Sequence, residues 1–264
     1  MSTYVISGAA SGIGAATRTH LESEGHTVIG VDLAGVEVTA DLSTAQGRAR
    51  AVEEITALAP DGIGGLVPCA GIAGLTHTDA QLLISVNFFG AITLATGLKP
   101  LLEQTRGAVV LLSSNSVTCQ PGWADTDKAG GIVEACLADD EAGARGLAAA
   151  TEAVQVYPAS KAALAYWARR EAVKPEWAGR GIRINAVAPG LIATPMTDAL
   201  REDPELGVFA DAYPTALERP GEPTEIAALI GFLLSPAASL LVGSVVFADG
   251  GTDAMLHPVQ PASS

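Results

Sequence analysis

The chain has 264 residues, and 48% of them are hydrophobic, which is enough for a sizeable buried core and excludes a globally disordered protein. It carries 15 basic residues against 29 acidic ones, which gives a formal net charge of −14. This charge disfavours nucleic acids and anionic membrane surfaces as partners, because both are themselves negative.

The sequence also lacks the usual signals of exported and membrane proteins. No apolar run reaches the roughly 18 residues of a membrane span, and no basic stretch followed by a long apolar one begins the chain, so we expect no secretory signal. The three cysteines, Cys69, Cys119 and Cys136, form no CxxC pair, which argues against a disulfide framework and a zinc site. We therefore expect a cytoplasmic protein without a metal.

Short apolar runs alternate with helix-like stretches along the chain. Strands are predicted at Tyr4–Ser7, Val28–Asp32, Val36–Ala40, Leu66–Cys69, Ala108–Ser113, Ile182–Ala188 and Val245–Ala248. Helices are predicted at Ala15–Glu24, Ala45–Leu58, 79–103, 159–176 and 223–234. Apolar strands alternating with helices indicate a parallel sheet covered on both faces. We predict an α/β fold, a single doubly wound Rossmann-like domain over 1–257 with a seven-stranded parallel sheet, and a loose tail at 258–264.

Residues of about 118–152 break this rhythm with a long acidic insert. Within it, Glu134–Ala150 is rich in alanine and is predicted to be helical. A connection of this length inside a compact domain is usually functional or carries its own structure. Trp123 in the insert either reaches a ligand pocket or packs within the domain.

A glycine-rich turn, Gly8-Ala9-Ala10-Ser11-Gly12-Ile13-Gly14, follows the first strand and opens the first helix. Gly8, Gly12 and Gly14 let the chain turn tightly, and the backbone N–H groups of Ser11 and Ile13 lie where a pyrophosphate binds a helix N-terminus. The competing interpretation is a plain tight turn. The position after the first strand favours a dinucleotide site.

Asp32, with Leu33 beside it, ends the second strand, where a carboxylate accepts hydrogen bonds from the adenosine ribose and repels a 2′-phosphate. This predicts NAD(H) rather than NADP(H). Asp41 and Leu42 follow the third strand and are placed to cup the adenine. Cys69, Ala70 and Gly71 end the fourth strand, where the glycine lets the cofactor pass close to the backbone and Cys69 is expected only to pack.

The run Tyr157-Pro158-Ala159-Ser160-Lys161 places Tyr157 and Lys161 on one helix face, with Pro158 in the first turn. The lysine ammonium is expected to lower the pKa of the tyrosine, which then takes a proton from an alcohol or returns it to a ketone. Ser114 follows a strand end and is placed to hold the substrate oxygen. An ordinary exposed Tyr–Lys pair is the alternative. No GxSxG or HExxH motif supports a serine hydrolase or a zinc enzyme.

Together these residues resemble the short-chain dehydrogenase/reductase family over nearly the whole chain. The resemblance implies a catalytic set of Ser114, Tyr157, Lys161 and Asn87, where Asn87 helps to hold a water that links the lysine to solvent. It also implies a nicotinamide site at Pro189, Gly190, Ile192 and Thr194. The departures are Ser7 in place of the usual threonine, and Pro68-Cys69-Ala70-Gly71 in place of Asn-Asn-Ala-Gly. The main departure is the long spacing of 43 residues from Ser114 to Tyr157, which the insert accounts for.

The insert, the run at 41–45 and the run at 235–239 are similar to one subgroup, the bacterial 3α-hydroxysteroid dehydrogenase/carbonyl reductases. This implies an NAD(H)-dependent enzyme acting on 3α-hydroxysteroids, 3-ketosteroids and smaller carbonyl compounds. Three alternatives stay open: another secondary alcohol (terpene, aryl or polyol), a non-catalytic NAD-binding regulator, and a sugar-nucleotide epimerase or dehydratase.

The segment Thr194–Gly221 follows the nicotinamide turn and carries several apolar residues. We interpret it as a substrate lid in which Met196 contacts a hydrophobic substrate, because a hydride site must exclude water. Packing against the domain is the alternative. Family members commonly pair through the helices near 79–103 and 159–176, and an insert entering there favours a homodimer over a tetramer.

Overall fold

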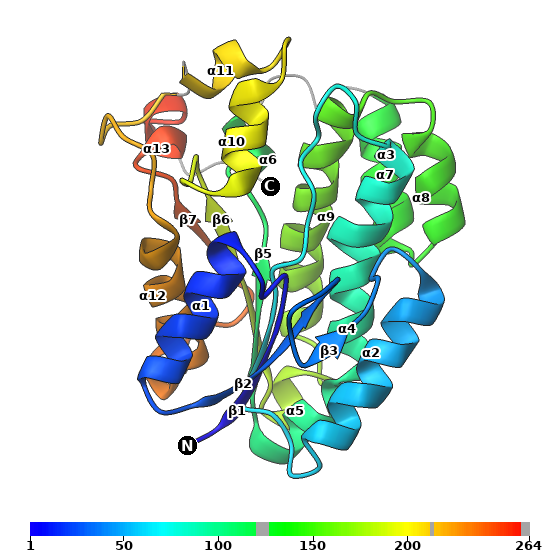
Figure 1. Ribbon diagram of the computed structural model, residues 1–264, viewed down its shortest axis with the longest axis vertical. Helices are drawn as coiled ribbons and strands as arrows, with labels where there is room; N and C mark the ends of the chain where they lie inside the picture. Colours follow the sequence, from blue (N-terminus) through cyan, green and yellow to red (C-terminus); the bar gives the residue numbers. More distant parts are fainter. Residues whose placement is uncertain (120–126, 212–213, 260–264) are drawn as a thin grey trace.

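The computed structural model describes residues 1–119, 127–211 and 214–259. Its centre is one parallel sheet of seven strands in the order β3-β2-β1-β4-β5-β6-β7 (Figure 1). The strands are β1 (Thr3–Ser7), β2 (Thr27–Asp32), β3 (Val38–Thr39), β4 (Gly65–Pro68), β5 (Ala108–Leu112), β6 (Arg183–Pro189) and β7 (Val245–Ala248). The order reverses between β1 and β4, which is where ligands bind in sheets of this kind. The predicted doubly wound fold is confirmed.

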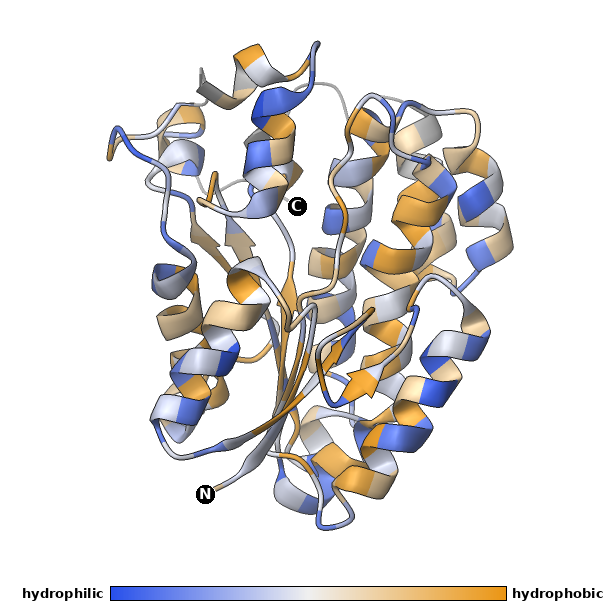
Figure 2. Ribbon diagram, viewed as in Figure 1, coloured by the Kyte–Doolittle hydropathy of each residue, from blue (hydrophilic) through white to orange (hydrophobic). Residues whose placement is uncertain are grey.

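The strands form because they are apolar on both faces. All five residues of β5 are buried, and β4 is likewise buried throughout. Hydrophobic residues are concentrated along the strands and on the inner faces of the helices (Figure 2). One hydrophobic core therefore packs on each face of the sheet.

Helices cover both faces of the sheet (Figure 1). One core lies under α1 (Gly12–Ser23) and α12 (Pro223–Leu234). The larger core lies under α2 (Ala45–Leu58), α4 (Ala91–Gly97), α5 (Lys99–Thr105) and α9 (Ala153–Ala172). Shorter helical segments include α6 (Ser116–Cys119), α10 (Pro195–Glu202), α11 (Gly207–Asp211), α13 (Thr252–Leu256), η2 (Ala178–Arg180) and η3 (Pro236–Ala238). Of these, α6, α10, α11 and α13 gather beyond the carboxyl ends of the strands, above the predicted site.

Two predicted helices differ from the observed ones. The stretch 79–103 is divided into α3 (Ala80–Ile84), a π-helix η1 (Ser85–Gly90), α4 and α5. The helix predicted at 159–176 begins earlier, at Ala153, so Pro158 lies inside α9 and not in its first turn. The missing N–H of a proline is most easily accommodated in a first turn, and that preference misplaced the boundary.

The insert forms two helices in place of the single one predicted over Glu134–Ala150. These are α7 (Asp127–Leu137) and α8 (Glu141–Ala148). Asp139 has a φ of 60°, a left-handed conformation that ends α7. The side chain of Asp140 then caps α8 by accepting a hydrogen bond from the Gly143 N–H at 2.9 Å. Alanine content does not reveal this break, because it depends on local capping.

One helical stretch, Ala80–Gly97, is long and apolar enough by composition to cross a membrane, which the sequence analysis did not anticipate. However, 61% of it is buried inside the protein. Leu83, Ile84 and Phe88 belong to the larger core. Its hydropathy is therefore explained by packing against the sheet and α9.

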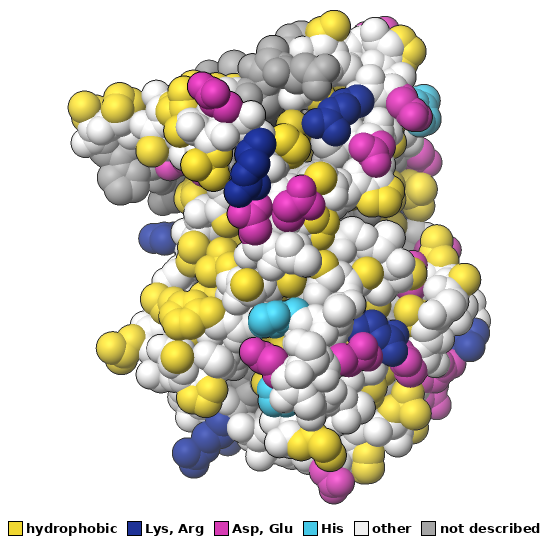
Figure 3. All heavy atoms as spheres, turned by 60° about the vertical axis from the view of Figure 1, so that its left-hand side comes forward, with side chains coloured by type: hydrophobic (Ala, Val, Ile, Leu, Met, Phe, Trp, Pro, Cys, Tyr) yellow, Lys and Arg dark blue, Asp and Glu magenta, His cyan; other side chains and the backbone are white. Residues whose placement is uncertain are grey.

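The surface agrees with the negative net charge. On the face seen in Figure 3, acidic side chains are spread among scattered basic and hydrophobic ones. Several basic groups form ion pairs, for example Arg18 with Glu37 at 2.7 Å. No extended basic surface that would attract a phosphate backbone is visible on this face.

Candidate active site

The glycine turn packs tightly against the end of β4. Gly8 has a φ of +68°, and a Cβ there would lie 2.8 Å from the backbone nitrogen of Ala70. A Cβ on Gly14 would lie 2.1 Å from the carbonyl oxygen of Gly8. Both distances are too short for any side chain, so the turn requires glycine at these two positions. The turn thus exposes backbone N–H groups at the start of α1.

The turn also approaches the segment after β6. Ser11 is the N-cap of α1, yet its side chain makes no capping hydrogen bond to the helix. A Cβ on Gly12 would lie 3.5 Å from the Thr194 methyl carbon, so the two segments face each other. Ile13 follows, half-buried against the smaller core. The arrangement brings the predicted pyrophosphate and nicotinamide residues to one place.

Asp32 lies at the end of β2 and points toward the turn. One carboxylate oxygen accepts a hydrogen bond from the Ala10 N–H at 3.0 Å, and the other accepts from the Leu33 N–H at 2.7 Å. These contacts fix the carboxylate beside the glycine turn. The Leu33 side chain itself is 68% exposed.

Asp41 and Leu42 follow β3 and are held by local hydrogen bonds. The Asp41 carboxylate accepts from the Ser43 N–H at 2.9 Å, and its hydrogen bonds with Ser43 hold the pKa of Asp41 below its ordinary value. Leu42 is buried, and its carbonyl accepts from Arg48 at 3.2 Å. The predicted adenine segment is therefore fixed in place.

The two serines after β5 have different partners. The Ser113 hydroxyl donates to the carbonyl of Lys161 at 2.8 Å and so ties β5 to α9. The Ser114 hydroxyl accepts from the Ser116 N–H at 3.1 Å and also hydrogen-bonds with Tyr157. Of these two serines, Ser114 is therefore the one whose side chain contacts the tyrosine.

Tyr157 and Lys161 project from the same face of α9. The Lys161 ammonium donates to the carbonyl of Leu112 at 2.9 Å and lies 5.7 Å from the centroid of the Tyr157 ring. Burial lowers the pKa of Lys161 to about 8. Burial also raises the pKa of Tyr157, and the hydrogen bond with Ser114 acts in the opposite direction. The expected net lowering of the tyrosine pKa is therefore not seen in the protein alone.

Asn87 lies in the π-helix η1, a distortion that often marks functional sites. Its Oδ1 accepts from the Ile72 N–H at 2.8 Å, and its Nδ2 donates to the Ile72 carbonyl at 3.1 Å. A Cβ on Gly71 would lie 3.2 Å from Oδ1 of Asn87 and 3.6 Å from Nζ of Lys161. The Asn87 amide and the Lys161 ammonium therefore both lie next to Gly71.

Gly74 is a residue that the sequence analysis missed. A Cβ there would lie 2.4 Å from the Ala153 carbonyl oxygen and 2.7 Å from Cβ of Tyr157. The loop after β4 thus presses directly on the first turns of α9. Nothing in the local sequence distinguishes this glycine from the other 28 glycines of the chain.

The segment after β6 is equally constrained. A Cβ on Gly190, which follows Pro189, would lie 2.8 Å from the Cα atom of Asp249. Ile192 forms an isolated bridge with Gly221, and its carbonyl accepts from the Thr197 hydroxyl. Thr194 caps α10. The predicted nicotinamide residues therefore form one ordered turn.

The predicted lid contains α10 and α11. Met196 is 36% exposed. Asp203, just after α10, accepts hydrogen bonds from the backbone and hydroxyl of Thr76, at 2.9 and 2.8 Å. These bonds and those from Glu205 and Leu206 lower the pKa of Asp203 to about 2. The sequence analysis did not identify this link between the lid and the loop after β4.

Two other predicted residues need a brief account. Burial raises the pKa of the Cys69 thiol to about 12, which fits the predicted packing role because the thiol stays protonated. Trp123 lies outside the described residues.

Comparison with known proteins identifies the family. The profile of the short chain dehydrogenases matches residues 2–125, and the profile described as enoyl-(acyl carrier protein) reductase matches residues 143–253. The chain is 38% identical to the 3-alpha-hydroxysteroid dehydrogenase/carbonyl reductase of Comamonas testosteroni, over 98% of this chain and 100% of that protein. The chain belongs to the short-chain dehydrogenase/reductase family. It is therefore an oxidoreductase acting on CH–OH groups, and the stretch that neither profile covers lies in the insert.

Two further relatives bear on the substrate. The 3-alpha-hydroxysteroid dehydrogenase of Pseudomonas sp. B-0831, solved in complex with NADH, is 42% identical with a TM-score of 0.92, over 98% of this chain and 100% of that one. The coniferyl-alcohol dehydrogenase of a Pseudomonas species is 31% identical over 94% of both chains. The TM-score shows that the first has nearly the same fold as this chain.

Proposed function

We infer that the protein is an NAD(H)-dependent dehydrogenase that interconverts secondary alcohols and ketones, with 3α-hydroxysteroids and 3-ketosteroids as its substrates. The observation that carries this proposal is the meeting of Ser114, Tyr157 and Lys161 beside the glycine turn. The full-length similarity to two 3-alpha-hydroxysteroid dehydrogenases supports the substrate class.

The residues around the turn fit a dinucleotide. Backbone N–H groups at Ser11, Gly12 and Ile13 would bind the pyrophosphate, and Asp32 would accept from the adenosine ribose. The cofactor supplies the hydride acceptor or donor at its nicotinamide ring. The Asp32 carboxylate would repel a 2′-phosphate, which favours NAD(H), the cofactor bound in the Pseudomonas relative.

Tyr157 is the proposed acid and base. It would take the hydroxyl proton during oxidation and donate a proton to the carbonyl oxygen during reduction. Ser114 would hold the same oxygen beside it. Because burial raises the Tyr157 pKa, phenolate formation requires a positive charge nearby, which Lys161 supplies in its protonated form.

Asn87 and the gap beside Gly71 are the proposed exit for the proton. The Asn87 side chain is held on the backbone of Ile72, and the lysine ammonium lies just beyond Gly71. A water in this gap would connect Lys161 to solvent. Asn87 would therefore act by positioning that water.

Substrate recognition is assigned to the lid. Figure 1 shows α10 and α11 beyond the carboxyl ends of the strands, and Met196 on α10 is 36% exposed. An apolar lid suits a flat hydrophobic substrate. An aryl alcohol is the second candidate, favoured by the full-length similarity to coniferyl-alcohol dehydrogenase. We keep the expectation that the enzyme works in the cytoplasm.

The test is an absorbance assay for NADH formation with purified protein, NAD and androsterone. Parallel reactions contain NADP, cyclohexanol and coniferyl alcohol. We expect turnover with NAD and the steroid. Activity on coniferyl alcohol or cyclohexanol alone would support the proposed alcohol dehydrogenase reaction but reject steroids as substrates. NADH binding without any turnover would favour a regulator.

A further inference from the structure

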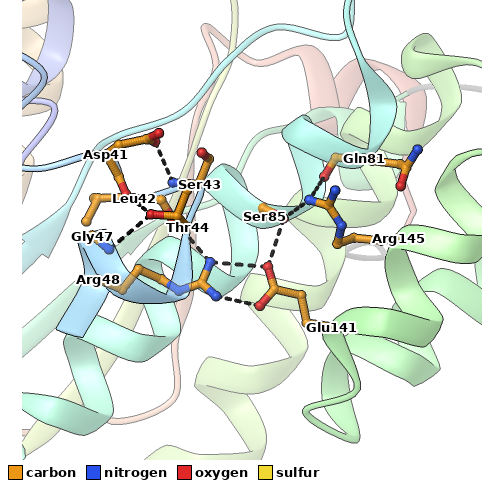
Figure 4. Close-up of polar contacts among 10 residues, drawn as sticks. All are labelled: Asp41, Leu42, Ser43, Thr44, Gly47, Arg48, Gln81, Ser85, Glu141 and Arg145. Carbon is orange, nitrogen blue, oxygen red and sulfur yellow. Dashed lines mark hydrogen bonds and ion pairs between the residues drawn. The ribbon is translucent and has the colours of Figure 1, made fainter.

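A nearly buried arginine connects the insert to the predicted adenine segment (Figure 4). Arg48 lies on the inner face of α2, beside Ala51 and Ile55, and is only 4% exposed. Its guanidinium group contacts Glu141 on α8, which lies 93 residues further along the chain. A buried guanidinium is costly unless its hydrogen bonds are satisfied, so its partners are informative.

On one side, Arg48 supports the segment Asp41–Leu42. Its Nη1 donates to the Leu42 carbonyl at 3.2 Å. A Cβ on Gly47 would lie 1.9 Å from the Asp41 carbonyl oxygen, so the segment rests directly on the first turn of α2. The position of Leu42 therefore depends on the position of the arginine.

On the other side, Glu141 holds the guanidinium. Nη1 donates to Oε1 of Glu141 at 3.2 Å, and Nη2 donates to Oε2. The same Oε1 accepts from the Ser85 hydroxyl at 2.8 Å, and that hydroxyl accepts from Nη1 of Arg145 at 2.7 Å. Figure 4 shows the carboxylate of Glu141 between the two arginines. One carboxylate thus joins α2, α8 and η1.

The network also reaches both ends of η1. Ser85 is its first residue and is fully buried. Gly90 is its last residue, and a Cβ there would lie 3.3 Å from Cβ of Leu42. The π-helix is therefore fixed at its start by Glu141 and packed at its end against the adenine segment.

We propose that α8 is a brace for the adenosine end of the cofactor site, and that Glu141 is a positioning residue for cofactor binding. Glu141 acts through Arg48, which in turn holds Leu42. This inference rests on the proposed function in one respect. It assumes that the ligand at Asp41–Leu42 is the adenosine half of NAD(H). It gives the acidic insert a role in affinity for the cofactor.

Removing the carboxylate breaks this arrangement. In Glu141→Gln, Arg48 loses its charged partner, and its long side chain can then turn toward water and release the Leu42 carbonyl. We expect the dissociation constant of NADH to rise about tenfold, as for the loss of a charge-assisted hydrogen bond. The rise should be the same for ADP-ribose, which lacks the nicotinamide.

The experiment is a calorimetric titration of the full chain with NADH and, separately, with ADP-ribose. The matched control is Glu134→Gln, the same change at an exposed position of α7 in the same insert. In an Arg48→Met background, Glu141→Gln should cause no further loss, because its partner is already gone.

An unchanged dissociation constant in folded Glu141→Gln, or an equal loss in Glu134→Gln, would overturn the proposal. If Glu141→Gln does not fold, Glu141→Asp is titrated instead, because it keeps the charge and shortens the reach. It should weaken both ligands equally, and wild-type affinity would then overturn the proposal. Failure of the wild type to bind NADH would reject the proposed function itself, which is a separate result.

Discussion

At the scale of single residues, the site depends on two buried groups whose pKa values move in opposite directions. Burial lowers the pKa of Lys161 to about 8 and raises that of Tyr157. Each shift disfavours the charged form that catalysis needs. The pair is useful only if the lysine ammonium and the tyrosine phenolate stabilise one another, which their shared helix face allows.

This coupling predicts a pH effect for Lys161→Met. Without the ammonium, the Tyr157 pKa should rise further, so the acid limb of the pH profile for alcohol oxidation should move to higher pH. The measurement is kcat/KM against pH for the wild type and the variant. An unchanged acid limb would mean that the lysine does not assist the tyrosine.

Cofactor choice is also decided at one residue. Asp32→Ala combined with Leu33→Arg removes a carboxylate and adds a cation where a 2′-phosphate would lie. We expect the ratio of kcat/KM for NADP over NAD to rise by roughly tenfold or more, as for a change in one charged contact. A wild-type enzyme that already prefers NADP would contradict the role given to Asp32.

At the scale of elements, loops rather than helices join the two sides of the site. Asp203 after α10 binds the backbone and hydroxyl of Thr76 in the loop after β4. Gly74 in the same loop presses on Tyr157. The lid and the catalytic helix are therefore connected through one short loop.

The Asp203 contact predicts a lid variant. Asp203→Asn removes the negative charge that accepts hydrogen bonds from Thr76, Glu205 and Leu206. The lid should then loosen, and the KM of the alcohol should rise roughly three- to tenfold. Asp198→Asn, an exposed change on the same lid, is the control. Equal effects in both variants would show that the Thr76 contact does not hold the lid.

The pH dependence of this contact follows from its sign. The pKa of Asp203 is about 2 in the folded protein, below its ordinary value of 3.8. The contact therefore stabilises the lid fully above the ordinary value and is lost only as the pH falls toward about 2. The lid should stay closed to the same degree across neutral pH.

The sequence predicted most of these elements because their signals are local. β7 and α2 have the predicted boundaries. Ser114, Tyr157 and Lys161 are proposed from strand ends and helix spacing, which are also local signals. The contacts that it missed are long-range. Thr76 and Asp203 are 127 residues apart, and Arg48 and Glu141 are 93 residues apart. Such pairs depend on how helices pack, which no local pattern encodes.

At the scale of the whole molecule, the insert covers part of the two helical stretches near 79–103 and 159–176. α7 packs on α9, and α8 packs on α3. On the opposite layer, α12 exposes Phe232 at 45%, and Leu240 nearby is 95% exposed. These two exposed apolar side chains are candidates for contact with a second copy.

We therefore expect a homodimer. Light scattering of the purified protein should give the mass of two chains, and Phe232→Glu with Leu240→Glu should shift it to one. A mass of four chains would contradict the expectation, because it would require the surface covered by the insert.

The central claim is that Tyr157 is the acid and base of this enzyme, and the most direct test is Tyr157→Phe. Turnover of the alcohol and NADH binding are measured on the same purified variant. We predict that kcat falls by about 10²- to 10⁴-fold while the dissociation constant of NADH stays close to that of the wild type. Turnover at the wild-type rate would contradict the assignment.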